Sequence, residues 1–372
     1  MKHISKYSIN GKINTLFSHR FVSKDSFPIE KNPLVDFYEM NQNFEFNFKP
    51  SKDNLRISLK YLGDALSKNY ISIINIHNFM STFFIEDLSD FASGIKRNQT
   101  LKSLRISPYF SYTSPNNSRN MKLLSESISM NPTIECLDIS TNKIGNDFKS
   151  FANVFKNEFQ LTELYLNNIM MDDESMKYLA ISLEKNFVLI KLSLYNNQLT
   201  KISGQYIGGL LSKNNCLKYL NVSSNILASG TSEIFESLHS NDSLEVLMIN
   251  NISMDNIEGI GLGKMILKNK KLNRIDMHFN VKLNENTTNF IGDCIEKNNI
   301  IKRFKINITN IDRFIGRLWF NYSITDVDFR VKEIPELMNQ FLNKNFEYLK
   351  FQMLIHRKII NLPMFDIKFL FQ

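Results

Sequence analysis

One pattern of apolar positions recurs along most of the chain. In the clearest copies an aliphatic residue occupies positions 1, 4, 6 and 11 of a short phrase, and asparagine occupies position 9. Two such copies begin at Leu189 and Leu217. Positions 4 and 6 alternate like one face of a β-strand, whereas the segment after each phrase has apolar residues at helical spacing. The pattern therefore predicts one strand and one helix in every repeat.

The copies keep a nearly constant spacing. Steps of 27 to 29 residues separate the clear copies, and weaker copies extend on both sides. One unit cannot cover its own apolar face, so the units must stack and share a continuous core. Strands about 4.8 Å apart, beside helices about 10 Å wide, predict a stack that curves with its strands inside. The clear copies begin at Ile134, Leu161, Leu189, Leu217, Leu244, Leu272 and Ile301, and the weaker ones at Ile71, Leu101, Ile324 and Phe346, with one further strand predicted at Phe44, Phe46 and Phe48.

These phrases resemble the leucine-rich repeats of the ribonuclease-inhibitor type, whose units have about 28 residues with a strand and a full α-helix. The resemblance covers roughly residues 41–352. It implies an α/β fold, a leucine-rich-repeat solenoid or horseshoe with a parallel β-sheet on the concave face and α-helices on the convex face. We expect an N-terminal cap at residues 1–40, repeats of about 28 residues at 41–322, and shortened repeats with a C-terminal cap at 323–372.

Asparagine at position 9 is expected to be structural. A buried asparagine there can bond the backbone groups that lose their partners where each strand turns outward. Ile169 and Ile252 take that position in two copies, so the sequence predicts an interrupted ladder. The asparagines of the ladder are Asn142, Asn197, Asn225 and Asn280.

The charge distribution argues against a nucleic-acid groove. The net charge is +8, but residues 1–70 carry +4 and residues 331–372 carry +2, which leaves +2 for residues 71–330. The excess therefore lies mostly at the ends and not along the repeats, and we expect no nucleic-acid partner.

The sequence also predicts where the protein acts. No run of about 18 apolar residues occurs, and residues 1–20 lack the apolar core of a secretory signal. Cys136, Cys216 and Cys294 lie on different repeats, which favours a reducing compartment. We expect a cytoplasmic protein, in its own cell or, if it is a delivered effector, in a host cell.

Side chains at positions 3, 5 and 7 are expected to point out of the concave sheet. Three consecutive strands present Tyr165, Tyr195 and Tyr219 there, which predicts an aromatic patch, because tyrosine is enriched among residues that dominate binding. The alternative is that single exposed tyrosines are ordinary on a sheet. Further along, the alternating charges of Asp276, Lys305, Asp328 and Lys350 predict a ladder that neutralises itself. The predicted partner-binding residues are Tyr165, Tyr195, Tyr219, Glu163, Lys191, Asn221, Arg274 and Arg303.

Motifs for catalysis and cofactor binding are weak. Gly259, Gly261 and Gly263 lie within a helical half-repeat, and no strand–turn–helix phosphate loop surrounds them. Cys136 and His77 are two strands apart, too far for a nucleophile and its base. Histidine and cysteine show no metal-ligand spacing, and Asp172 with its acidic neighbours is typical of a helix start. We predict no catalytic residue, metal or cofactor.

The leading hypothesis is a non-catalytic recognition module that binds a partner protein on its concave face. The resemblance implies inhibitors, scaffolds or sensors, and some intracellular bacteria deliver similar proteins as effectors into host cells. The alternative from another class is a regulator that resembles a GTPase-activating protein for a small GTPase. We expect a monomer, with a dimer through the apolar residues near the C-terminal end as the other arrangement.

Overall fold

The computed structural model describes residues 44–48, 55–69, 71–77, 88–107, 117–145, 148–152, 155, 160–307, 323–324 and 326–330. All of them belong to Gln42–Gln372, the second of two units into which the chain divides. The predicted cap at residues 1–40, the repeat copy at Phe346 and the apolar C-terminal tail lie outside the described residues. The domain boundaries stay predictions.

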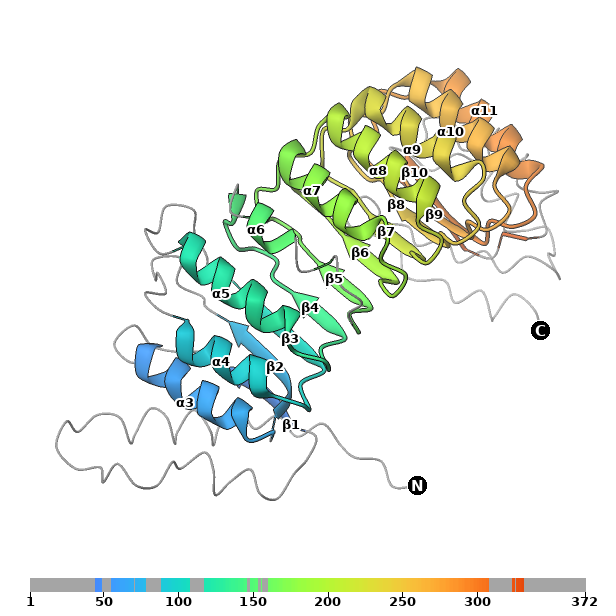
Figure 1. Cartoon of the computed structure of the whole chain (residues 1–372). Coiled ribbons are helices and arrows are strands. Elements are labelled where there is room, and N and C mark those ends of the chain that lie inside the picture. Colours follow the sequence, from blue (N-terminus) through green and yellow to red (C-terminus); the bar gives the residue numbers. More distant parts are fainter. Residues whose placement is uncertain are drawn as a thin grey trace, which may run out of the picture. The chain divides into compact units, whose positions relative to one another are not determined.

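The described strands form one parallel sheet whose order follows the chain, and Figure 1 shows them side by side in sequence colours. Each strand pairs with the next in the register that the repeat predicts; Leu164, for example, pairs with Leu192, and Leu192 with Leu220. The fold class is therefore confirmed. The strands are β1 (Phe44–Phe48), β2 (Ile71–His77), β3 (Ser103–Ser107), β4 (Cys136–Asp138), β5 (Glu163–Tyr165), β6 (Lys191–Ser193), β7 (Tyr219–Asn221), β8 (Val246–Met248), β9 (Arg274–Asp276), β10 (Arg303–Asn307) and β11 (Asp326–Arg330).

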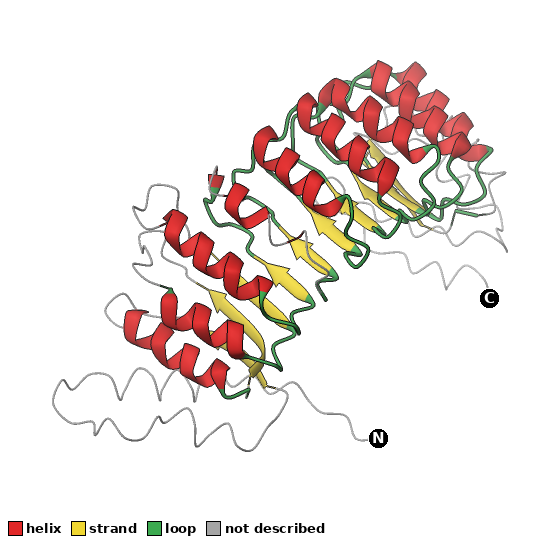
Figure 2. Cartoon of the chain, in the orientation of Figure 1, coloured by secondary structure: helices red, strands yellow, loops and turns green. Residues whose placement is uncertain are grey.

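The described helices pack along one face of this sheet (Figure 2). We call the opposite face, which carries the side chains at positions 3 and 5 of each phrase, the strand face. The helices are α3 (Leu55–Ser67), α4 (Ser89–Arg97), α5 (Asn117–Ser129), α6 (Phe148–Ala152), α7 (Asp173–Leu183), α8 (Lys201–Lys213), the 3₁₀ turn η4 (Ala228–Gly230), α9 (Thr231–Leu238), α10 (Asn256–Lys268) and α11 (Glu285–Glu296).

The core lies between the strands and the helices. Residues at positions 4 and 6, such as Leu192 and Leu194, are fully buried, and the strand-face positions of β5 and β7 are half-buried. Each helix adds its own apolar stripe, for example Met176, Leu179 and Leu183 of α7. Burying one such side chain contributes about 1.5–3 kcal/mol, so the stack is stabilised by the sum over neighbouring units.

The asparagine ladder at position 9 forms as predicted. Asn225 is buried; its amide donates to the carbonyl oxygens of Leu194 and Val222, both at 2.9 Å. Its Oδ1 accepts from the backbone N–H of Asn197 and of Leu199. Where Ile169 takes position 9, the next asparagine, Asn197, accepts from the Ile169 N–H. An asparagine at position 169 would accept the Ile144 N–H, which here donates to the Ile169 carbonyl at 3.1 Å instead.

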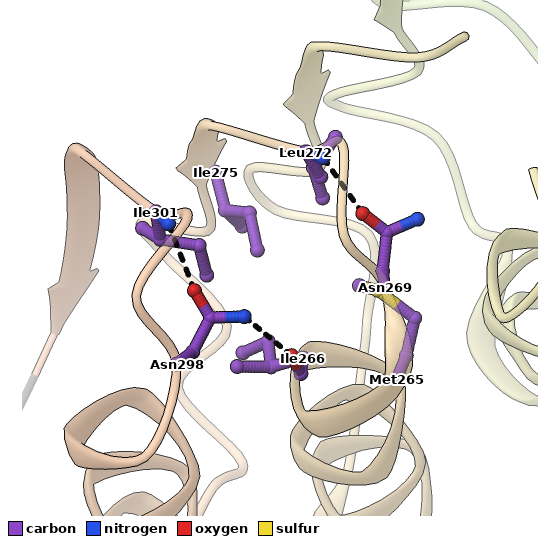
Figure 3. A pocket seen from close by; sticks show the side chains of 7 residues that line it. All are labelled: Met265, Ile266, Asn269, Leu272, Ile275, Asn298 and Ile301. Carbon is purple, nitrogen blue, oxygen red and sulfur yellow. Dashed lines mark hydrogen bonds between the residues drawn. The ribbon is translucent and has the colours of Figure 1, made fainter. Parts of the chain in front are cut away.

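A second asparagine ladder, which the sequence analysis missed, lies where each helix returns to the next strand. Figure 3 shows two rungs: Asn298 accepts from the Ile301 N–H and donates to the Ile266 carbonyl, and Asn269 accepts from the Leu272 N–H. The side chains in Figure 3 close this pocket too tightly to admit a water molecule. These amides therefore replace water as the partners of the buried backbone. The rungs are Asn98, Asn131, Asn186, Asn214, Asn241, Asn269 and Asn298.

Helix α7 is tied to α8 by the acids that the sequence assigned to a helix start. Asp172 is the N-cap residue of α7 and accepts from the Ser175 N–H at 2.8 Å. Asp173 reaches the next repeat, where it accepts from the Thr200 N–H at 2.9 Å and from the N–H and hydroxyl of Ser203. Burial raises the pKa of Asp173, but the bonds from Ser203 and Thr200 outweigh burial and lower the pKa below its ordinary value.

Because its folded pKa is lowered, Asp173 should stabilise the protein above about pH 4 and lose this contribution as the pH falls through the folded pKa. We expect Asp173→Asn to lower the free energy of unfolding by about 1 kcal/mol at neutral pH, with the difference closing in acid. Urea unfolding at several pH values measures it, with the exposed Asp242→Asn as control. If Asp173→Asn lowered the free energy of unfolding equally at every pH, the ionised Asp173 carboxylate would not be the stabilising group.

Candidate protein-binding face

The strand face carries two rows of side chains whose order is fixed by strand pairing. The row at position 3 runs through Glu163, Lys191, Tyr219, Val246, Arg274 and Arg303, each on the strand next to the last. The row at position 5 runs through Tyr165, Ser193, Asn221, Met248, Asp276 and Lys305. All the predicted partner-binding residues except Tyr195 therefore lie in these two rows.

A lysine lies between two of the predicted tyrosines. The Lys191 ammonium is 4.9 Å from the centroid of the Tyr165 ring and 5.1 Å from that of the Tyr219 ring. Both distances are within the range of about 6 Å in which a cation is attracted to an aromatic face. We call these three residues the Tyr–Lys–Tyr cluster. It joins β5, β6 and β7 through their side chains.

Glu163 fixes one side of the Tyr–Lys–Tyr cluster. Its carboxylate lies 3.9 Å from the Lys191 ammonium and accepts the Tyr165 hydroxyl at 2.6 Å. Burial raises the pKa of Tyr165, and the bond to Glu163 raises it further. Burial also raises the pKa of Tyr219, partly opposed by the charge of Arg274 and a hydrogen bond from Asn221. Both hydroxyls are therefore protonated at neutral pH, and the Tyr165 hydroxyl already donates its proton to Glu163.

Tyr195 lies apart from the Tyr–Lys–Tyr cluster. Its side chain is 41% exposed, and its backbone N–H donates to Asn167 Oδ1 at 2.9 Å. Within the described repeats, its ring stacks on neither of the other two tyrosines. The three residues were predicted as one aromatic patch, whereas the geometry brings together two of them around a cation.

The predicted alternating charge ladder begins at Asp276, which also has a neighbour on its own strand end. Asp276 is buried, and its Oδ1 lies 3.5 Å from Nδ1 of the equally buried His278. Positions 5 and 7 of one phrase share a face, but their spacing alone did not predict this pair. Lys305 lies beside Asp276 and Asp328 in the strand register. The side chain of Asp328 and all of Lys350 lie outside the described residues.

Bulky Phe279 occupies a backbone position that other repeats fill with small or polar residues. Position 8 has positive φ in six successive copies, at Thr141, Asn168, Asn196, Ser224, Asn251 and Phe279. Asparagine tolerates this region, whereas a phenylalanine at φ 63° is strained. Phe279 is also 47% exposed, so burial of its ring does not explain its presence.

The glycines that suggested a nucleotide site have a packing role. A Cβ on Gly259 would lie 2.5 Å from the Thr287 methyl group, and one on Gly263 would lie 2.6 Å from the Phe290 ring. Both glycines belong to α10 and allow α11 to approach. Burial raises the pKa of the Cys136 thiol, which disfavours a thiolate nucleophile.

The described part of the chain contains no group of three or more histidine, cysteine or acidic side chains placed to hold a metal ion. Among the same residues, no helix is both long enough and apolar enough to cross a membrane.

Repeated strand–helix units, one parallel sheet in chain order and an asparagine ladder at the strand ends together define the leucine-rich-repeat fold. No protein-family model matches the sequence, and neither does any curated protein. The fold is similar to the Rad7–Elc1 complex of yeast, with a TM-score of 0.49 and 19% identity over 67% of this chain and 60% of that chain. It is also similar to the leiomodin-1 actin-binding site 2 structure, with a TM-score of 0.35 and 20% identity over 41% of this chain and 87% of that chain.

Proposed function

We propose that the protein is a non-catalytic recognition module of the ribonuclease-inhibitor-like type that binds a partner protein on its strand face. The observation that carries this proposal is the Tyr–Lys–Tyr cluster, in which Lys191 lies between Tyr165 and Tyr219 and Glu163 holds both Tyr165 and the lysine. The helix-containing units of 27 to 29 residues support the ribonuclease-inhibitor-like type.

The geometry of the cluster favours binding for an energetic reason. An interface must restrict the side chains it uses, at roughly 0.5–1.5 kcal/mol for each flexible one. Here the lysine and the two rings already restrict one another before a partner arrives. Two tyrosine rings then offer a large apolar area, and their hydroxyls offer polar contacts at its edge.

The proposed setting is the cytoplasm, either of the cell that makes the protein or of a host cell into which it is delivered as an effector. The asparagine-, lysine- and isoleucine-rich composition is compatible with a delivered bacterial protein. In both settings the strand face would bind the partner, so one affinity-capture experiment tests both.

Replacing the two tyrosines should remove the partner. We expect Tyr165→Ala/Tyr219→Ala to weaken binding by about 2 kcal/mol or more, which is roughly 30-fold, because hot-spot tyrosines carry losses of this size. Affinity capture from lysates of native and host-type cells, with quantitative mass spectrometry, identifies the proteins that wild type retains and the double variant loses. Tyr206→Ala, on helix α8, is the matched control and should retain the partner.

Two results would oppose the proposal. One is equal recovery of the same partner by wild type and the double variant. The other is a partner that is a small GTPase whose GTP hydrolysis this protein accelerates, since that outcome supports the regulator of the other class. GTP hydrolysis by each captured GTPase, with and without the protein, separates the two.

A further inference from the structure

Among the described residues, Arg274 on the strand face forms no ion pair, and what this implies about the partner rests on the proposed function. In the row at position 3, Arg274 lies between Val246 on β8 and Arg303 on β10. Strand spacing puts the two arginines about 4.8 Å apart at the backbone. Like charges on neighbouring strands repel one another. Arg303 lies beside Asp326 on β11 in the strand register, whereas Arg274 has Val246 on its other side.

The guanidinium of Arg274 also lacks a hydrogen-bond acceptor. Its Nε is buried and has no hydrogen-bond partner, and no acidic side chain in the described ranges forms an ion pair with Arg274. Asp276, two residues further along the same face, does not serve this role. Its Oδ1 has no hydrogen-bond partner and lies 3.5 Å from Nδ1 of His278. A buried N–H donor with no acceptor costs free energy, and a bound acceptor would recover it.

Lys191 lies in the same row as Arg274 but has partners for its charge. Its ammonium has Glu163 at 3.9 Å and two aromatic faces, so its charge is already balanced within the chain. Between the two cations lie Tyr219 and Val246, both half-buried. Lys191 and Arg274 are therefore three strand spacings apart, roughly 14 Å, with the apolar surface of Tyr219 and Val246 between them.

We propose that Arg274 binds the carboxylate of an aspartate or glutamate in an acidic segment of the partner protein, and that a neighbouring apolar side chain of that segment packs on Tyr219 and Val246. The planar guanidinium matches a carboxylate through two parallel hydrogen bonds. A polyphosphate backbone fits less well, because Asp138, Glu163 and Asp276 lie on the same face and would repel it.

The test uses random peptides displayed on phage and selected on the wild-type protein. The most enriched peptide is synthesised with a fluorescent label, together with a copy in which its acidic residue is replaced by the matching amide. Both are titrated against wild type, Arg274→Gln, Arg274→Lys, Tyr219→Ala and the control Arg119→Gln, an exposed arginine of α5. A labelled oligouridylate is titrated in parallel.

We expect selected peptides that carry an acidic residue beside an apolar one. Arg274→Gln and the amide replacement should each weaken binding by about tenfold, and the two changes together should weaken it no further, because both remove one interaction. Arg274→Lys should recover only part of the affinity, and Arg119→Gln should bind like wild type. Arg274→Gln should also resist urea as well as wild type does, since it removes an unpaired charge.

The possible failures are distinguishable. Peptides that need Tyr219 but not Arg274 overturn the carboxylate site and leave the proposed function intact. Peptides that need Arg274 but not Tyr219 support the carboxylate site and argue against the Tyr–Lys–Tyr cluster as the main anchor. Tight binding of the oligouridylate that depends on Arg274, or strong destabilisation by Arg274→Gln, overturns the inference.

Discussion

Replacing Asn214 by alanine should lower the free energy of unfolding by about 3 kcal/mol, the largest effect we expect from a single amide. Asn214 is buried; its amide donates to the Leu183 and Asn186 carbonyls at 3.2 and 2.7 Å. Its Oδ1 accepts from the N–H groups of Cys216 and Leu217 at 3.0 and 2.9 Å. The substitution therefore removes four hydrogen bonds; the Leu183 carbonyl keeps the Asn186 N–H, whereas the Asn186 carbonyl and the Cys216 and Leu217 N–H groups lose their side-chain partner.

The chain supplies its own control for this prediction in the next residue. Asn215 is exposed, so Asn215→Ala should change stability by less than about 0.5 kcal/mol. Urea unfolding followed by circular dichroism compares the two variants with wild type. Equal stabilities for the two variants would mean that the second asparagine ladder does not hold the helix returns in place.

Gly204→Ala should destabilise the protein by about 2 kcal/mol, although alanine is the better helix former. Gly204 lies in α8, and a Cβ there would collide with the Gly230 carbonyl oxygen. A Cβ on Gly230 would in turn collide with the Lys201 carbonyl oxygen. Two backbone segments approach each other here without side chains between them, so neither can move aside without shifting a helix.

Gly209→Ala, in the same helix, should change the free energy of unfolding in the opposite direction. Gly209 is exposed and a Cβ there would meet no atom within 4 Å. Alanine should then stabilise the protein by about 0.5–1 kcal/mol through helix propensity alone. Thermal and urea unfolding of both variants measures the difference, and a stabilised Gly204→Ala protein would refute the close approach of α8 to η4.

The repeat phrase was a reliable guide to the fold because each position has one structural role. Leu192 and Leu194 are buried because they point from their strand toward the helices. The number of residues between Leu192 and its strand partner Leu220 leaves room for one helix only. The asparagine at position 9 was equally predictable, since a buried amide at a strand end has few alternatives to bonding the backbone. Asn214 was missed because its role depends on where the helix of its repeat ends.

The contacts within the candidate site were less predictable, because each strand-face side chain can contact residues on its own strand and on both neighbouring strands. The sequence placed Tyr165, Lys191 and Tyr219 on one face, and the strand register puts them on three neighbouring strands. It did not predict that Lys191 would lie between the two rings. The separation of Tyr195 and the pairing of Asp276 with His278 also depend on side-chain directions that spacing does not determine.

By itself, the sequence determined the repeat length, the alternation of strand and helix and the set of residues facing away from the helices, since these follow from periodicities of two, 3.6 and about 28 residues. Only the tertiary structure decided which of those outward side chains satisfy one another. Lys191 has Glu163 and two aromatic rings, whereas Arg274 faces a second arginine, because pairing between units depends on distances across strands that the local sequence does not contain.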